Sequence, residues 1–166
     1  RSLIGVPGIP PAGLFFFDGI LRKMKKVILF TDGGARGNPG PAGAGALILD
    51  ENEKVIAEVS KALGHQTNNW AEYEAVILGL QAIKKHFGKQ IVQVDIEVKL
   101  DSELVARQLP NKYQITETTL LPQFIKVHNM LVKDFPRVSF THIPREKNKD
   151  ADRLANEAMD RASTSL

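Results

Sequence analysis

Residues 27–63 read VILFTDGGARGNPGPAGAGALILDENEKVIAEVSKAL, and this stretch decides the fold class. The apolar run at 27–30 predicts a buried strand that stops at the turn signal TDGG. After a predicted glycine-rich loop over 37–45, the runs 46–49 and 55–63 indicate two further strands, and the polar residues between them have the composition of a hairpin turn. Three consecutive strands joined in this way predict an antiparallel meander.

Beyond residue 68 the hydrophobic pattern changes to a helical period. Helices are predicted over residues 69–87, 101–109, 120–135 and 149–162, and strands over 92–100 and 137–143. We assign Glu74 to the solvent face of the first helix, opposite Ala75 and Ile83. Because the later parallel strands need covered crossovers, the order βββαβααβα predicts an α/β fold. The expected architecture is a mixed five-stranded sheet, an antiparallel meander followed by parallel strands, with helices on both faces.

The composition is that of one globular domain, with 166 residues of which 43% are hydrophobic and 25% charged. The chain has no cysteine, so disulfides, thiolate zinc sites and cysteine nucleophiles are excluded, and a reducing cytoplasm is the expected location. Any metal site must be built from carboxylates and histidines. The formal charge of +3 is compatible with a phosphate-rich partner but too small to identify one.

Residues 1–23 show neither helical nor strand periodicity, and they contain three prolines and the run Phe15-Phe16-Phe17. We expect them to be an appended or disordered leader, with a partner-binding tail as the alternative, and the domain to begin at Met24. The apolar run at 13–17 is too short to cross a membrane, and the leader lacks the features of a secretory signal. No membrane association is therefore predicted.

Four carboxylates are placed at the ends of predicted elements. Asp32 ends the first strand, Glu72 lies in the first turn of the first long helix, Asp101 ends the fourth strand and Asp152 opens the last helix. In an α/β sheet such positions converge at the carboxyl edge of neighbouring strands. Taken singly, each has a more frequent structural interpretation: a turn former, a solvated helix residue, a helix cap and a charge near a helix N-terminus, respectively. The surrounding sequence must decide between the two interpretations.

That context consists of the segments TDGGARGNPGP at 31–41, TNNWAEY at 67–73, LDSE at 100–103 and HIPREKN at 142–148, which runs into DADRLAN at 150–156. Together they resemble the motifs of prokaryotic type 1 ribonuclease H, in that family's order and at its usual spacings. The resemblance covers residues 25–162, and chance agreement of four separated motifs is improbable. It implies a ribonuclease H-like fold and hydrolysis of the RNA strand of an RNA/DNA hybrid, leaving 5′-phosphate and 3′-hydroxyl ends.

The same resemblance assigns the catalytic residues within a domain spanning 24–166. Asp32, Glu72, Asp101 and Asp152 match the family's catalytic carboxylates, which bind two divalent ions, normally Mg²⁺, with Mn²⁺ as the alternative. Hard cations prefer oxygen ligands, and a metal pair can stabilise both the attacking water and the leaving 3′-oxygen. His142 matches a mobile loop histidine that aids proton transfer or product release; a strand-end histidine without a role is its alternative.

Substrate contacts are also implied by the resemblance. The glycine-rich loop matches neither the Walker A nor the dinucleotide fingerprint, and in the family its backbone approaches the RNA strand. The predicted substrate-binding residues are Gly33, Arg36, Asn38, Thr67, Asn68 and Asn69. Small residues allow that approach, and the 2′-hydroxyl distinguishes RNA from DNA. For residues 67–69, helix capping before Glu72 is an alternative that is compatible with substrate contact.

Two positions depart from the family's pattern. Segment 110–119 has Lys112 as its only basic residue, so the basic handle with which some members grip the hybrid is expected to be missing. Glu103 stands where certain members carry glutamine, which puts one base-edge contact in doubt. Two rivals to a monomeric hybrid nuclease are a non-catalytic hybrid-binding module, expected to have lost a carboxylate, and a ribonuclease H domain of a larger polymerase.

Overall fold

The structure is a computed structural model that describes residues 14–17, 20–110 and 114–165. Its main sheet consists of β3 (Lys25–Ala35), β4 (Gly40–Asp50), β5 (Val55–Gln66), β6 (Val94–Leu100) and β7 (Val138–His142). The helices are α1 (Asn68–Phe87), α2 (Glu103–Gln108), α3 (Leu121–Asp134) and α4 (Lys149–Thr164). Beyond residue 24 the order of strands and α-helices is therefore the predicted one.

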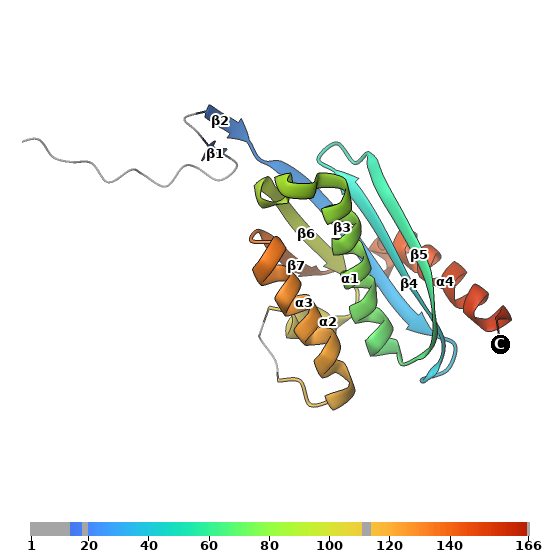
Figure 1. The fold of residues 1–166 in the computed structure, drawn as a ribbon. Coiled ribbons are helices and arrows are strands. Elements are labelled where there is room, and N and C mark those ends of the chain that lie inside the picture. The colour runs from blue at the N-terminus through green and yellow to red at the C-terminus, as the bar shows by residue number, and fades with distance from the viewer. Residues whose placement is uncertain (1–13, 18–19, 111–113, 166) are drawn as a thin grey trace, which may run out of the picture.

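The five strands form a mixed sheet in the order β5-β4-β3-β6-β7. β3, β4 and β5 pair antiparallel as a meander, and β6 pairs parallel with both β3 and β7. Helix α1 packs on β3 and β4 with α3 against it, and α4 packs on β4 and β5 from the other side (Figure 1). The predicted α/β class, with helices on both faces of the sheet, is confirmed.

The glycine-rich loop is shorter than predicted. β3 continues through Asp32 to Ala35 and β4 begins at Gly40, so only residues 36–39 lie outside the ladder. The small residues that suggested a loop instead let α4 lie directly on β4: a Cβ on Gly45 would be 2.4 Å from the carbonyl oxygen of Ala151. The predicted strand start at residue 92 is also wrong, because Gly88–Gln93 form a 3₁₀ turn before β6.

Helix α1 is buried on two faces, which corrects the assignment of Glu74 to solvent. Because α1 lies between the sheet and α3, Glu74 is buried and accepts a hydrogen bond from Gln123 Nε2 at 2.7 Å. The neighbouring Tyr73 is fully buried and donates its hydroxyl to Gln108 Oε1 of α2 at 2.7 Å. Polar contacts with α2 and α3 therefore add to the apolar core that fixes the position of α1.

The predicted leader contains regular structure that the sequence pattern did not indicate. β1 (Leu14–Phe17) and β2 (Ile20–Lys23) pair antiparallel as a separate two-stranded sheet. The expectation of disorder over residues 1–13 lies outside the described residues. Among the helices of the described chain, none combines the length and apolar character needed to span a membrane.

Candidate active site

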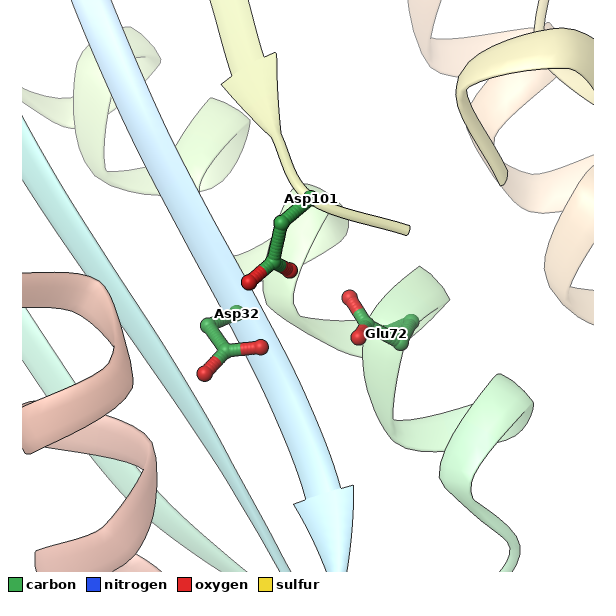
Figure 2. A group of neighbouring side chains, drawn as sticks. All are labelled: Asp32, Glu72 and Asp101. Atoms are coloured by element: carbon green, nitrogen blue, oxygen red, sulfur yellow. The ribbon is translucent and has the colours of Figure 1, made fainter. Parts of the chain in front are cut away.

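The fold brings three of the four predicted carboxylates together at one end of the sheet. Asp32 lies in β3, Asp101 directly follows the neighbouring strand β6, and Glu72 is the fifth residue of α1. One carboxylate oxygen from each lies within 4.8 Å of the others, and the three side chains point toward one another in Figure 2. Asp101 does not cap α2, because Ser102 does so by accepting a hydrogen bond from Val105 N at 3.3 Å.

Glu72 reaches Asp32 because the first turns of α1 lie directly on Gly33. A Cβ at Gly33 would be 2.3 Å from the carbonyl carbon of Ala71 and 2.5 Å from the backbone nitrogen of Glu72. No other residue type would allow this approach. The Gly33 amide also donates to Asp32 Oδ1 at 3.0 Å, which orients that carboxylate. Gly33 therefore has a structural role at the site, and its contact with substrate stays a prediction.

Burial and mutual repulsion disfavour the ionised forms of the three carboxylates. The pKa of Asp32 is raised to about 7, first by burial and then by the charges of Asp101 and Asp152. Burial, followed by the charges of Asp32 and Asp101, raises the pKa of Glu72 well above its ordinary value. Burial also raises the pKa of Asp101. A cluster of this kind needs a nearby cation to be fully ionised near neutral pH.

Asp152 lies on the same cleft but outside this trio. It is in the first turn of α4 and accepts a hydrogen bond from Arg145 Nη2 at 2.9 Å. Arg145 belongs to the 3₁₀ turn Arg145–Lys147 that precedes α4. The arginine therefore brings positive charge to the edge of an otherwise acidic cluster.

An open cleft of about 600 Å³ runs past these side chains. Besides the four carboxylates it is lined by Gly33, Arg36, Asn68, His142 and Arg145, among others. His142 is exposed, and its Nε2 lies 3.3 Å from the carbonyl oxygen of Asp101. The remaining histidines, His65, His86 and His128, are exposed away from the cleft lining, as predicted.

The predicted substrate-binding residues form a connected group beside the cleft. Asn68 Oδ1 accepts a hydrogen bond from the backbone nitrogen of Ala35 at 2.8 Å. The backbone nitrogen of Asn68 donates to Asn38 Oδ1 at 3.0 Å, which joins the 36–39 loop to the start of α1. Thr67 caps α1 by accepting from Trp70 N at 3.2 Å. The capping alternative is therefore confirmed for Thr67, and its contact with RNA stays a prediction.

The other two predicted contacts, Arg36 and Asn69, are each held by an acidic residue. Arg36 pairs with Asp160 of α4 at 2.8 Å, and Asn69 Nδ2 donates to Glu117 Oε2 at 3.3 Å. Glu103, at the position that departs from the family's pattern, forms an ion pair with Arg107 one turn along α2. The prediction made for Lys112 lies outside the described residues.

Two residues at the site were not selected from the sequence, although both lie in the HIPREKN segment. Arg145 pairs with Asp152, and Asn148 is buried with its side chain hydrogen-bonded to the backbone of β3. The signal that could have identified them is that both are polar residues inside a motif already assigned to the site. Their importance depends on how α4 docks on the sheet, which a single sequence does not give.

The carboxylate trio fits a divalent cation. Among the described residues, Glu72 Oε2 is buried without a hydrogen-bond partner, although a buried carboxylate oxygen ordinarily has one. Oxygen donors of this kind are the preferred ligands of Mg²⁺ and Mn²⁺. A cation at Asp32, Glu72 and Asp101 would satisfy the orphaned oxygen and offset the repulsion within the trio.

A mixed sheet of this strand order, with acidic residues gathered where β3 and β6 meet α1, defines a ribonuclease H-like domain. Comparison with protein-family models agrees: residues 30–158 match the family described as reverse transcriptase-like. Two structures of LC11-RNase H1, an enzyme isolated from compost by a metagenomic approach, are similar over nearly their whole length. The first has a TM-score of 0.79 and 48% identity and covers 84% of this chain and 99% of that one. The second, a complex with RNA/DNA hybrid, has a TM-score of 0.78 and 47% identity, with coverage of 82% and 98%.

Relatives known by sequence place the chain in the same group. A bifunctional protein of Mycobacterium tuberculosis is 39% identical over 141 residues, which are 84% of this chain but 37% of that protein. A ribonuclease H of Hydrogenovibrio crunogenus is 34% identical in an alignment of 152 positions that covers 82% of this chain and 97% of its own. The chain thus spans little more than a third of the mycobacterial relatives it matches, but nearly the full length of others. It belongs to the type 1 ribonuclease H family.

Proposed function

We propose that this protein is an endoribonuclease that hydrolyses the RNA strand of RNA/DNA hybrids and leaves 5′-phosphate and 3′-hydroxyl ends. The observation that carries the proposal is the carboxylate trio of Asp32, Glu72 and Asp101, whose raised pKa values and orphaned oxygen call for a cation. The resemblance of the whole domain to an enzyme solved with RNA/DNA hybrid supports the choice of substrate.

Catalysis is proposed to use two divalent ions, with Mg²⁺ as the natural ion and Mn²⁺ as a substitute. Asp32, Glu72 and Asp101 would hold metal directly, and Asp152 would join them after exchanging its Arg145 partner. When bound, a metal pair lowers the pKa of the attacking water and neutralises charge on the leaving 3′-oxygen. The placement of the trio by β3, β6 and α1 would fix where the ions are held, and the ions would in turn position the scissile phosphate.

The side chains around the trio are proposed to handle the strand and the protons. His142 is the last residue of β7 and is exposed at the cleft, where it would reach a phosphate or the leaving 3′-oxygen. Arg36, Asn38, Asn68 and Asn69 lie on the side of the loop and α1, where they would contact sugars and minor-groove edges of the hybrid. Only an RNA strand offers 2′-hydroxyls to such groups.

The setting of the enzyme is part of the same proposal. We place it in the cytoplasm, a reducing compartment that suits a chain without cysteine. We propose that it acts as a monomer, because all four carboxylates come from one chain. The catalytic domain is proposed to span residues 24–166.

The test compares end-labelled RNA/DNA hybrid, duplex RNA and duplex DNA, each with and without MgCl₂. We expect cleavage of the hybrid alone, only with metal, and product ends that accept ligation as 5′-phosphates. Asp101→Asn should abolish cleavage, whereas Asp150→Asn, which changes an exposed acidic residue in the first turn of α4, should keep it. Binding of the hybrid by the wild-type protein without cleavage at any metal concentration would instead support a non-catalytic binding module.

A further inference from the structure

Asn148 is a buried asparagine where β3, α4 and the Arg145 turn meet. Only 1% of the residue is exposed. Its Nδ2 donates to the carbonyl oxygen of Thr31 at 2.8 Å, across 117 residues of sequence. The backbone carbonyl oxygen of Asn148 accepts a hydrogen bond from the backbone nitrogen of Asp152 at 3.0 Å. Because Thr31 directly precedes Asp32, one residue connects the backbones that carry two of the four carboxylates.

Burial of the Asn148 side-chain amide is energetically unfavourable, and the start of α4 does not by itself explain why the amide is there. In the described part of the chain its Oδ1 is buried without a hydrogen-bond partner, and its side chain does not cap α4. A buried acceptor left unpaired is unfavourable, and a serine at this position would avoid that cost and cap the helix. The polar group that the fold uses is therefore the amide nitrogen, which carries two N–H donors.

The Asn148 side chain also influences Asp101. Burial raises the pKa of Asp101, and a hydrogen bond from the Asn148 side chain opposes that rise. The contacts of Asn148 with defined geometry are its bond to the Thr31 carbonyl oxygen and the bond that it accepts from the Asp152 backbone nitrogen. Through these two contacts Asn148 joins the backbone beside Asp32 to the turn that carries Asp152, although it has no place in the metal-ligand set.

We propose that Asn148 is a positioning residue of the metal site, which holds the turn of α4 that carries Asp152 against the backbone beside Asp32. This inference rests on the proposed function, because it concerns the same carboxylates. Contacts that orient metal ligands commonly determine metal affinity, and their loss costs about 10–100-fold in metal affinity or activity.

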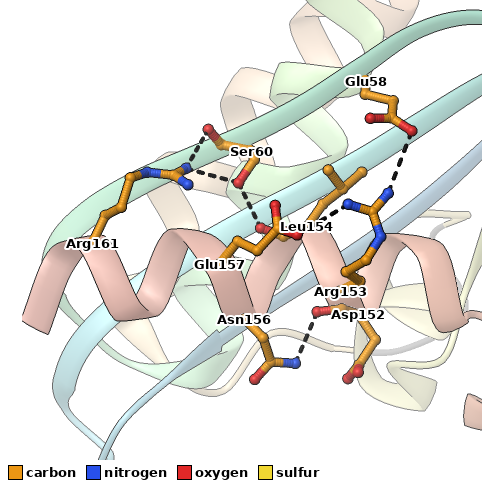
Figure 3. Close-up of polar contacts among 8 residues, drawn as sticks. All are labelled: Glu58, Ser60, Asp152, Arg153, Leu154, Asn156, Glu157 and Arg161. Carbon is orange, nitrogen blue, oxygen red and sulfur yellow. Dashed lines mark hydrogen bonds and ion pairs between the residues drawn. The ribbon is translucent and has the colours of Figure 1, made fainter.

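The variant that tests this role is Asn148→Ser. Serine is a preferred N-cap residue, so α4 should still begin at the same place, but serine lacks the amide nitrogen that donates to the Thr31 carbonyl oxygen. Its control is Ser60→Ala. Ser60 Oγ donates to the carbonyl oxygen of Leu154 at 2.7 Å and holds α4 on β5 (Figure 3). Both substitutions remove a side-chain hydrogen bond to the backbone across the contact between α4 and the sheet.

Three measurements separate positioning from simple stabilisation: the Tm without metal, the Kd for MnCl₂ by calorimetry without substrate, and the Mg²⁺ concentration that gives half-maximal cleavage. Asn148→Ser should raise the Kd and the half-maximal Mg²⁺ concentration by about 10–100-fold while its Tm stays close to that of Ser60→Ala. Ser60→Ala should bind metal as the wild type does. Asn148→Ala, which has no group to replace the amide, should show the same rise and serves if the serine variant does not fold.

Two results would overturn the inference: an unchanged Kd in the folded Asn148 variants, or an equal rise in Ser60→Ala. Either would leave Asn148 as a structural contact of α4. Failure of the proposed function looks different, since a wild-type protein that neither binds Mn²⁺ nor cleaves hybrid would contradict the carboxylate assignment itself.

Discussion

Substitution of Gly33 by alanine tests whether the close contact between β3 and α1 creates the site. The added Cβ would lie 2.3–2.5 Å from the backbone of Ala71 and Glu72, whereas ordinary contacts begin at 3.4 Å, a shortfall of about 1 Å. The neighbours are backbone atoms that no rotamer change can move, so the first turns of α1 must withdraw from β3. Overpacking of this kind costs about 1–3 kcal/mol, or about 2–12 °C in Tm for a protein of this size.

The loss of activity should exceed the loss of stability, because Glu72 moves with the helix. A displacement of about 1 Å at a reacting centre can cost about 10²-fold in rate. The control is Gly79→Ala, which strains the same pair of elements two turns along α1, where the Cβ would lie 2.6 Å from Leu29 Cδ1. It should lower Tm but keep hybrid cleavage. Wild-type activity and Tm in Gly33→Ala, or an equal fractional loss of activity in both folded variants, would refute the reasoning.

Three further predictions concern pH, His142 and the N-terminal segment. Because the pKa of Asp32 in the folded protein, about 7, lies above its ordinary value of 3.8, this residue contributes stability below pH 4 that is lost as the pH rises through 7. Without metal, the excess Tm of Asp32→Asn over wild type should therefore grow from pH 4 to pH 8, and a constant difference would contradict the raised pKa. His142→Ala should slow hybrid cleavage by about 10²–10⁴-fold and change the pH–rate profile with little effect on Mg²⁺ affinity, and unchanged rates at every pH would leave the residue without a role. A protein beginning at Met24 should keep the Tm and activity of the full chain, since the ion pair that Lys23 makes with Glu51 is exposed and worth little. A large fall in Tm would mean that residues 1–23 pack on the domain.

The positions of the strands and helices could be predicted from the sequence pattern, but not every face that the fold buries. Periodicity located every element of the main sheet, but it assigned Glu74 to solvent because α3 covers the opposite face of α1. The glycine- and alanine-rich parts of β3 and β4 were not predicted as strand, because glycine and alanine have low strand propensity. Only the packing of α4 on Gly45 shows why such residues belong in this sheet.

At the site, the sequence indicated which carboxylates lie together, but not which contacts the neighbouring side chains make. Asp32, Glu72 and Asp101 could be chosen from short motifs, and the sheet order explains why they meet. The pairing of Asp152 with Arg145 and the burial of Asn148 depend on the angle at which α4 enters the sheet, so they required coordinates. A single sequence specifies which groups carry charge, but not which of them share a cation.

The carboxylate trio is assembled against its own electrostatic repulsion, so the rest of the fold must supply the free energy that holds it together. The apolar core between α1 and the sheet supplies much of it, since Leu29, Val76 and Leu80 are fully buried. Contacts far from the trio supply another part, such as Arg161, whose guanidinium donates to the backbone and hydroxyl oxygens of Ser60 at the far end of α4 (Figure 3). The substitutions that separate these contributions are those that leave the core intact and change the spacing of the carboxylates. For this reason Gly33 and Asn148, neither of which bears a charge, should affect metal binding more strongly than their chemistry alone would indicate.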